Sequence, residues 1–438
     1  MRSHWNTVKC PSICIAYWTV SLHLLFFSPA YPPSPGGGER FARSLAQALS
    51  ERGHNLTFIT SVARQEQDYW KPPEQNKHAC LMDGSVTVWQ CPLKPFPGGG
   101  RAVGLLRRAM VLLSPLPGST ALLLRLARLY PPVVDIDAAL SQVRQPVDVV
   151  HAFNLSWEHL ALRGFEHAQN NNLPYILTPF IHLSADGSNR AALPVTMRHQ
   201  RKLMQEASAV LTLTQEPLDG LSARGISIRQ GAVLGGGVDV VPEMKNPEAL
   251  LERYSLPPSF ALFVGRANSG KGATHAALAV QQLRRAGHGA SLVLAGRATP
   301  EFQDVWKRLD PAVQPFVRFL GSVSETEKHA LMAQCDMLLL PSKHDAMGIV
   351  MLEAWSHGKP VIGARAGGIP GVVSHGVDGL LVEYGDVDSL AKAMRSLWQQ
   401  PALRRELGER GRQKVARQYT WERACDVAEA TYHELLGG

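Results

Sequence analysis

Short apolar runs alternate with helix-period stretches along almost the whole chain, and this alternation limits the folds open to it. A strand that returns through a helix to pair in the same direction builds a parallel sheet covered by helices. The runs fall into an N-terminal group (24–29, 55–60, 86–91, 148–153, 175–180 and 209–214) and a C-terminal group (261–266, 291–296, 317–322, 337–342, 360–365 and 379–384). Each group predicts a Rossmann-like, doubly wound α/β domain, with a ligand cleft between the two domains.

The domain boundaries follow from where these runs begin and end. We expect an N-terminal extension over residues 1–21, a first domain over 22–243 and a second domain over 244–415, with the junction near Pro242 to Asn246. The apolar segment Ile13 to Phe27 is also typical of a secretory signal peptide. We favour a buried first strand over Leu22 to Phe27, because cleavage of a signal would remove the strand that leads into the next motif.

The composition is that of a folded protein with an anionic partner. Of the 438 residues, 45% are hydrophobic and 19% are charged, which excludes a disordered chain. The net charge of +8 favours a nucleotide, a nucleic acid or an anionic membrane face as partner. The six scattered cysteines form neither a disulfide framework nor a complete zinc motif, so we expect free thiols in a reducing cytoplasm.

Residues 84–134 differ from the rest of the chain because all of their charges are basic. Lys94 and five arginines, at positions 101, 107, 108, 125 and 128, alternate with Leu, Val and Met. As helices, residues 101–113 and 121–130 would have apolar faces edged with arginine. Two interpretations stay open: core helices with solvated arginine edges, or a monotopic face that rests on anionic lipid at the inner face of the membrane.

The stretch FVGRANSGKGAT (263–274) has the glycine and lysine spacing of a nucleotide-binding P-loop. A P-loop needs Ser or Thr after its Lys to ligate magnesium, and this chain has Gly272 there. The acid that should close another strand is also missing, because the best candidate, Asp336, precedes its apolar run. We therefore predict a diphosphate site without a metal, in which Arg266 and Lys271 supply the positive charge.

The stretch PSKHDAMGIVMLEAWSHGKP (341–360) places two acids around the start of a helix. The pattern predicts a strand, a loop that carries Asp345, and a helix over 348–357 in which Glu353 interrupts an apolar run. Carboxylates accept hydrogen bonds from vicinal hydroxyl groups of ribose and sugar rings. Phosphate is attracted by free N–H groups at a helix start, here those of Gly348, Ile349 and Val350. We therefore expect both acids to face one ligand that carries sugar and phosphate groups.

These motifs resemble those of a known family, the retaining glycosyltransferases of family 4. The family's E-x7-E signature is met by Asp345 and Glu353, and the resemblance covers nearly the whole chain from about Leu22 onward. It implies the GT-B architecture, in which two Rossmann-like domains face each other across a cleft. Residues 416–438 are similar to the family's final helix, which crosses back onto the N-terminal domain.

The resemblance implies a role for each residue of the second domain's site. Glu353 would hold the ribose of a nucleoside-diphosphate sugar, and Asp345 would hold the hydroxyl groups of the transferred sugar. Arg266 and Lys271 would bind the diphosphate and stabilise it as it leaves. The family transfers sugar with retention at the anomeric carbon, so the leaving phosphate itself is expected to accept the proton of the acceptor.

The N-terminal domain would supply the opposite side of the cleft. By resemblance, a loop formed by Gly36, Gly37 and Gly38 would close over the donor, and His182 would touch the sugar or the acceptor. A strand-end histidine with satisfied hydrogen bonds is the alternative for His182. We expect His151 to be structural.

The resemblance implies an enzyme that transfers sugar to a glycan or lipid-linked acceptor, in the synthesis of cell-surface polysaccharide or glycolipid. We expect neither a metal nor another cofactor, and no nucleic-acid partner. The chain departs from the family at Asp345, where Glu is usual, and at Ala346-Met347, where Pro-Phe or a similar pair is usual. A non-catalytic sugar-nucleotide-binding protein and a P-loop hydrolase are the alternatives to a transferase.

Overall fold

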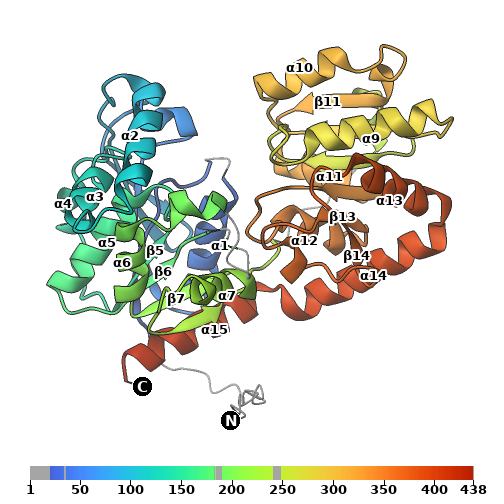
Figure 1. Ribbon diagram of the computed structural model, residues 1–438. Coiled ribbons are helices and arrows are strands. Elements are labelled where there is room, and N and C mark those ends of the chain that lie inside the picture. Colours follow the sequence, from blue (N-terminus) through green and yellow to red (C-terminus); the bar gives the residue numbers. More distant parts are fainter. Residues whose placement is uncertain (1–19, 34–35, 182, 184–189, 240–247, 438) are drawn as a thin grey trace, which may run out of the picture.

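The computed structural model describes residues 20–33, 36–181, 183, 190–239 and 248–437, which form two α/β domains side by side (Figure 1). The first domain contains an eight-stranded sheet of order β3-β4-β2-β1-β5-β6-β7-β8. Its strands are β1 (His23–Phe27), β2 (Asn55–Ser61), β3 (Ala79–Asp83), β4 (Val86–Cys91), β5 (Val149–Phe153), β6 (Tyr175–Thr178), β7 (Ala209–Thr212) and β8 (Gly231–Val233). The second contains a six-stranded sheet of order β11-β10-β9-β12-β13-β14. Its strands are β9 (Ala261–Val264), β10 (Leu292–Ala295), β11 (Val317–Gly321), β12 (Met337–Leu340), β13 (Val361–Ala364) and β14 (Gly379–Val382).

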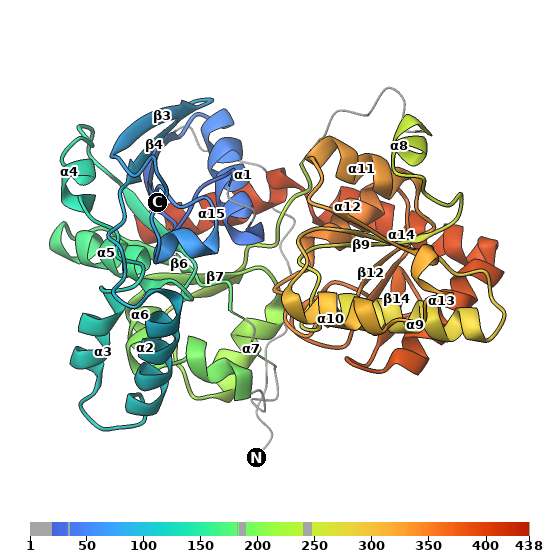
Figure 2. The same ribbon diagram turned by 90° about the horizontal axis from the view of Figure 1, so that it is seen from above.

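Helices cover the sheets of both domains (Figures 1 and 2). Those before the junction are α1 (Gly37–Glu51), α2 (Gly99–Leu113), α3 (Thr120–Ala127), α4 (Ile136–Leu140), α5 (Glu158–Asn170), α6 (Arg198–Glu206) and α7 (Gln215–Ala223), with short 3-10 turns η1 (Glu66–Tyr69) and η2 (Arg190–Val195). Those after it are α8 (Glu248–Arg253), α9 (Ala273–Arg285), α10 (Pro300–Arg308), α11 (Glu325–Gln334), α12 (Ile349–Ser356), α13 (Val387–Gln399), α14 (Pro401–Gln418) and α15 (Trp421–Leu435), with turns η3 (Gln314–Phe316) and η4 (Ile369–Gly371). The predicted junction at 242–246 lies outside the described residues.

The central strands are apolar because helices bury both of their faces. Every residue of β1, β5, β10, β12 and β13 is buried, which accounts for their continuous hydrophobic runs. β1 pairs in parallel with β2 and β5 in the middle of its sheet, as a buried first strand requires. All twelve predicted strands are present, and the doubly wound α/β prediction is confirmed.

The prediction of purely parallel sheets is wrong at one edge. β3 pairs antiparallel with β4, and a two-residue turn of Gly84 and Ser85 joins them. Gly84 has a φ of +61°, which glycine adopts readily, and glycine followed by serine is a typical two-residue hairpin loop. β3 was missed because it lies at the sheet edge with an exposed and mixed sequence. β8 was missed because it has only three residues, within a glycine-rich stretch.

The final helix leaves the second domain and packs on the first, as expected for residues 416–438. α15 lies along α1, and Glu429 of α15 accepts hydrogen bonds from Arg52 (2.7 Å) and the His54 ring (3.0 Å). Farther along α15, the Tyr432 hydroxyl lies 2.8 Å from Nδ1 of His151 in β5. The C-terminal helix is therefore part of the N-terminal domain's core.

We expect Glu429→Gln to lower the free energy of unfolding by about 2 kcal/mol at neutral pH, because it weakens the charge-assisted bonds to Arg52 and His54. Burial raises the pKa of Glu429, but these two partners outweigh it, and the net pKa is lowered. The stabilisation is thus present above the ordinary carboxyl pKa, near 4.5, and is lost as the pH falls through the folded-state pKa. Urea unfolding at neutral and acidic pH measures both effects.

The matched control for this experiment is Glu422→Gln on the same helix, at an exposed side chain. This control should change the free energy of unfolding by less than about 0.5 kcal/mol at either pH. Equal losses for the two variants would show that Glu429 does not anchor α15.

Candidate active site

The predicted site residues of the second domain follow two neighbouring strands of its sheet. β9 and β12 lie side by side, and the chain leaves β9 toward β10 but leaves β12 toward β13. Ligands of open α/β sheets bind at such a switch in strand order. Lys271 follows β9 at the start of α9, and Asp345 follows β12 before α12. The topology therefore explains why residues more than seventy positions apart meet here.

Lys271 and Asp345 form an ion pair at this switch point. The Lys271 ammonium donates a hydrogen bond to Oδ2 of Asp345 at 2.8 Å. The turn before α9 depends on Gly272, which has a φ of +86°. A Cβ there would lie 2.3 Å from the carbonyl oxygen of Pro341. The Ser or Thr of a P-loop would therefore not fit, and the P-loop interpretation fails for a steric reason.

The loop that carries Asp345 is held by the glycine-rich turn after β13. The N–H of Gly368 donates to the carbonyl of Asp345 at 2.7 Å. A Cβ on Gly367 would lie 2.6 Å from that same carbonyl oxygen, so this close packing requires glycine. Gly348 then begins α12 with a φ of +71°. The first N–H groups of an α-helix have no intrahelical acceptor, so those of Gly348, Ile349 and Val350 stay candidates for binding phosphate.

Glu353 lies within α12 and is 6% exposed. Its Oε1 accepts a hydrogen bond of 2.8 Å from the ammonium of Lys328 in α11. Its Oε2 is buried and has no hydrogen-bond partner among the described residues. Burial raises the pKa of Glu353, and Lys328 and Arg40 offset this only in part. A buried carboxylate oxygen without a partner is costly, so this atom is suited to accept hydrogen bonds from a ligand.

A group of possible metal ligands surrounds Glu353. Carboxylate or ring atoms of Glu325, His329 and Glu353 lie within 4.8 Å of one another. Lys328 lies among them, because its ammonium donates to Glu325 at 2.7 Å as well as to Glu353. The nearby charge of Lys328 adds to burial and lowers the pKa of His329 to about 4. The ammonium of Lys328 therefore already supplies the positive charge that a metal ion would bring.

Two arginines connect the domains beside this site. Arg40 in α1 donates to Glu325 at 2.8 Å and lies 3.9 Å from Glu353. Arg266, which follows β9, pairs at 3.4 Å with Glu66 of the N-terminal domain. The structure thus brings Lys271 to Asp345, whereas Arg266 pairs across the domain interface instead. Figure 2 shows the two domains facing each other in this region.

The predicted glycine loop of the N-terminal domain is largely helical, which corrects the expectation for Gly36, Gly37 and Gly38. α1 begins at Gly37, and Gly36 is its N-cap residue. The side chain of Glu39 folds back over the helix start, so that a Cβ on Gly36 would lie 1.7 Å from its Oε2. Burial raises the pKa of Glu39. Gly36 therefore gives this carboxylate room at the helix start.

The two histidines singled out in the sequence have different outcomes. His182 lies outside the described residues. His151 is fully buried, and its Nε2 lies 2.8 Å from the Thr178 hydroxyl while its Nδ1 lies 2.8 Å from the Tyr432 hydroxyl. Burial lowers its pKa to about 3, so the ring is neutral and structural, as expected.

The sequence did not identify Arg40, Glu325 or Lys328 as site residues. All three are charged residues of helices, and charged side chains on helices are commonly solvated. Only the assembled fold shows that α1 and α11 bring them to Glu353. The sequence could have indicated Arg40 only by its position, directly after the glycines at 36–38 and Glu39.

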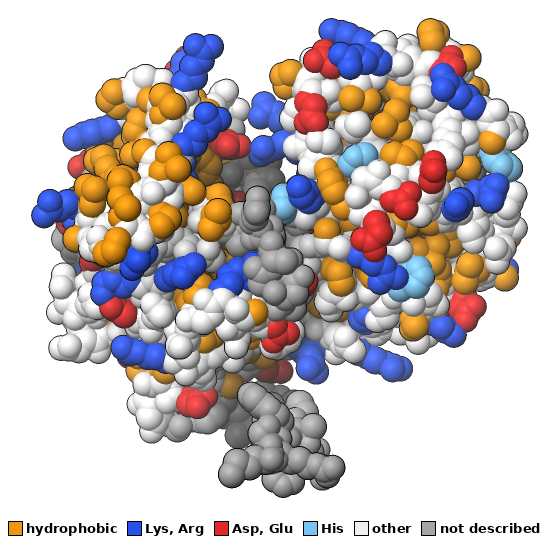
Figure 3. All heavy atoms as spheres, viewed as in Figure 1, with side chains coloured by type: hydrophobic (Ala, Val, Ile, Leu, Met, Phe, Trp, Pro, Cys, Tyr) orange, Lys and Arg blue, Asp and Glu red, His pale blue; other side chains and the backbone are white. Residues whose placement is uncertain are grey.

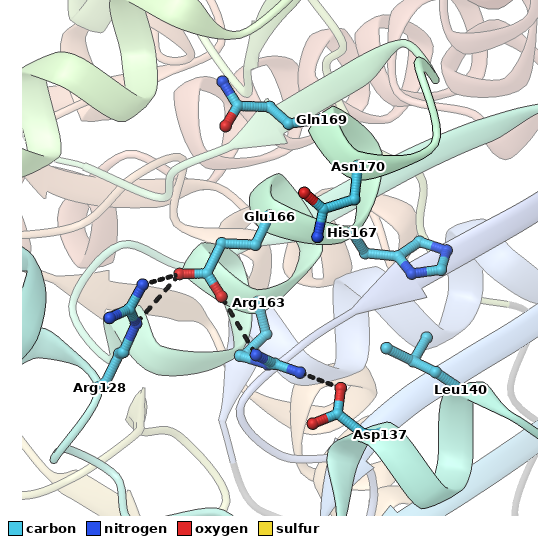
Figure 4. A pocket seen from close by; sticks show the side chains of 8 residues that line it. All are labelled: Arg128, Asp137, Leu140, Arg163, Glu166, His167, Gln169 and Asn170. Atoms are coloured by element: carbon cyan, nitrogen blue, oxygen red, sulfur yellow. Dashed lines mark hydrogen bonds and ion pairs between the residues drawn. The ribbon is translucent and has the colours of Figure 1, made fainter.

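A surface pocket elsewhere on the N-terminal domain contains charged residues that pair with one another. Arg128 and Arg163 both bind Glu166, and Arg163 also binds Asp137, as the dashed lines in Figure 4 show. Each formal charge drawn there thus has an opposite partner. These ion pairs hold α3 and α4 against α5. Because its charges are already paired with one another, we do not take this pocket as a second candidate ligand site.

Comparison with known proteins agrees with this geometry. The family description "Glycosyl transferase 4-like domain" matches residues 36–237, and "Glycosyl transferases group 1" matches residues 253–414. The glycogen synthase of Mycobacterium tuberculosis is 28% identical over 291 residues, which cover 65% of this chain and 68% of that protein. The 2-deoxystreptamine glucosyltransferase of Streptomyces kanamyceticus is 29% identical over 319 residues, covering 67% and 79%.

Solved structures show the same fold at low sequence identity. The sucrose-phosphate synthase of Thermosynechococcus elongatus aligns with a TM-score of 0.71 and 19% identity, over 95% of this chain and 99% of its own. HepE of Anabaena aligns with a TM-score of 0.65 and 19% identity, over 94% and 100%. With two sheets facing across a domain interface and a final helix that crosses back, the chain belongs to the group 1 glycosyltransferases with the GT-B fold.

Proposed function

We propose that this glycosyltransferase takes its sugar from a nucleoside-diphosphate sugar and transfers it, with retention at the anomeric carbon, to a glycan or lipid-linked acceptor. The transfer needs no metal and belongs to the synthesis of cell-surface polysaccharide or glycolipid. One observation carries the proposal: Glu353 is a buried carboxylate with one oxygen held by Lys328 and the other left open. A ribose diol, with two adjacent hydroxyl donors, suits such an acceptor.

The diphosphate of the donor binds beside this ribose site. The start of α12 offers N–H groups, and Lys271 offers an ammonium that now pairs with Asp345. On donor binding, Lys271 contacts the diphosphate as well, and Asp345 accepts hydrogen bonds from the sugar hydroxyl groups. Arg266 is exposed, and among the described residues its one ion pair is with Glu66 at 3.4 Å, so it is available to join Lys271 on the diphosphate. Two cations and a helix start supply the charge that a metal ion supplies in other transferases.

The transfer step breaks the bond between the anomeric carbon and the diphosphate oxygen. The acceptor hydroxyl oxygen forms its bond to that carbon on the same face, and its proton passes to the departing phosphate. The protein's part is electrostatic, because Lys271 and the N-terminus of α12 stabilise the negative charge that develops on the leaving group. The carboxylate of Asp345 stabilises positive charge that develops on the sugar ring.

The names of similar proteins support the donor and acceptor classes. HepE was solved with UDP and glucose, and the 2-deoxystreptamine enzyme is named a glucosyltransferase. WaaG, another structural neighbour, is described as a glycosyltransferase of lipopolysaccharide biosynthesis. These ligands and pathways belong to those proteins. For this chain they favour a nucleoside-diphosphate hexose as donor.

The direct test is nucleoside-diphosphate release from a panel of UDP-, GDP- and ADP-sugars and ATP, with and without magnesium. We expect release from one sugar nucleotide at the same rate in the presence of EDTA. The anomeric configuration of the product, read by NMR, tests retention. Magnesium-dependent release from ATP alone would contradict the proposal. Tight donor binding with no transfer to any acceptor would favour the non-catalytic alternative.

Glu353→Gln should lower kcat/KM for transfer by at least about 100-fold while the circular dichroism spectrum is unchanged, because the amide replaces a charged acceptor of ribose hydroxyl groups. Asp345→Glu restores the residue usual in the family, so it should keep or raise the activity. Asp345→Asn is its matched control and should lose activity. Wild-type rates in Glu353→Gln would refute the ribose assignment.

Lys328→Met should raise KM for the donor about tenfold and leave kcat nearly unchanged, because Lys328 orients Glu353 without touching the reacting atoms. Without this ammonium, the already raised pKa of Glu353 rises further. The carboxylate then protonates at a higher pH, so the acid rise in KM begins at a higher pH than in the wild type. Lys307→Met on α10 is the exposed control and should change neither constant. An unchanged pH profile of KM in Lys328→Met would contradict this role.

A further inference from the structure

The helices α2 and α3 expose leucines on the outside of the N-terminal domain. In α2, Leu105 and Leu112 are 64% and 77% exposed. Arg101 and Arg108 are also exposed. In the order 101, 105, 108 and 112 the spacings are four, three and four residues, which places all four side chains on one side of the helix. Exposed leucines are unusual when they repeat along a helix face, because water contact there is unfavourable.

The face continues beyond α2. Leu116 follows α2, and Leu122, Arg125 and Leu129 repeat at three and four residues in and just after α3, all of them exposed. Figure 3 shows hydrophobic side chains gathered over α2 and α3 with basic side chains at the margin. We call this surface the Leu/Arg face, with members Arg101, Leu105, Arg108, Leu112, Leu116, Leu122, Arg125 and Leu129.

The arginines of residues 84–134 divide into two groups. Arg107 binds the buried Glu158, and Arg128 binds Glu166, so these two hold α2 and α3 on the domain (Figure 4 shows Arg128). Arg101, Arg108 and Arg125 have no ion pair with any described residue and belong to the Leu/Arg face. Residues 84–134 contain no Asp or Glu at all. The face is therefore apolar and positive, with no carboxylate of its own to compensate.

We propose that the Leu/Arg face docks this transferase on an anionic lipid bilayer. The leucines enter the boundary between headgroups and acyl chains, and the arginines extend along the surface to lipid phosphates. No helix in the described part of the chain is long and apolar enough to cross a membrane, so the contact is peripheral. The proposal concerns a surface apart from the donor site, and lipid binding can be measured without sugar transfer.

Charge complementarity selects the bilayer over a second copy of this chain. A symmetric dimer through the Leu/Arg face would bring Arg101, Arg108 and Arg125 of one copy toward the same residues of the other. The face holds no carboxylate to separate these like charges. An anionic bilayer offers phosphates at the positions of the arginines and hydrocarbon at the positions of the leucines, so it satisfies both groups at once.

The test is co-sedimentation of the full chain with vesicles of phosphatidylcholine, with or without about 30% phosphatidylglycerol, at low and physiological salt. We expect binding to the anionic vesicles that weakens with salt. Leu105→Glu/Leu112→Glu should abolish binding. Arg101→Gln/Arg108→Gln/Arg125→Gln should weaken it about tenfold or more. Both substitutions change only exposed side chains, and melting temperatures near that of the wild type confirm folding.

Matched controls separate this face from net charge alone. Arg308→Gln/Arg318→Gln/Arg395→Gln removes three exposed arginines of the second domain, and Met82→Glu adds a charge at an exposed edge-strand residue. Both controls should bind vesicles as the wild type does. The proposal is overturned if the wild type ignores anionic vesicles or if the control triple loses as much binding. It also fails if the wild type forms a concentration-dependent dimer that Leu105→Glu/Leu112→Glu abolishes, without binding lipid.

Discussion

The ion pair between Lys328 and Glu353 is the contact on which the rest of the site depends. Both side chains are almost fully buried, so removal of Lys328 would leave Glu353 with only the more distant charge of Arg40 among the described residues. The pair fixes one oxygen of Glu353 and leaves the other without a partner. Arg40 reaches the same group from the other domain, at 3.9 Å from Glu353. One buried carboxylate therefore interacts with cations of both domains, which links the proposed donor site to the relative position of the domains.

Glycines allow the backbone segments around Asp345 to pack closely against one another. Gly272 packs against the Pro341 carbonyl, and Gly367 packs against the carbonyl of Asp345. A side chain at either position would clash with the carbonyl oxygen, so glycine is required there. The turns after β9 and β13 can therefore pack tightly against the loop after β12. This packing places Lys271 on Asp345 at the switch in strand order. The same glycine that excludes a P-loop hydroxyl thus helps to bring Lys271 to Asp345.

Local patterns predicted the fold well because each central strand is buried on both faces and reads as a continuous apolar run. They also singled out Asp345, Glu353 and Lys271 as candidates, because glycines and a helix start mark this region, and the structure brings Lys271 to Asp345. The antiparallel strand β3 was missed although Gly84-Ser85 marks its hairpin turn. Lys328 and Arg40 could not be predicted, because their roles arise only when helices distant in sequence meet at one carboxylate.

The positive charges at the domain interface and on the Leu/Arg face are of two kinds: some are paired with carboxylates and others have no ion pair among the described residues. This difference indicates which kind of ligand each group suits. At the domain interface, Lys271, Arg266 and Lys328 each contact a carboxylate. Cations held in place in this way before a ligand arrives favour one bound geometry; under the proposed function, Lys271 and Arg266 share their partners with a phosphate, whereas Lys328 stays on Glu353. On the Leu/Arg face, the arginines have no ion pair with any residue in the described ranges, and they lie among exposed leucines. Unpaired, flexible cations suit a surface of many mobile phosphates better than a single ligand, because no fixed geometry is required there.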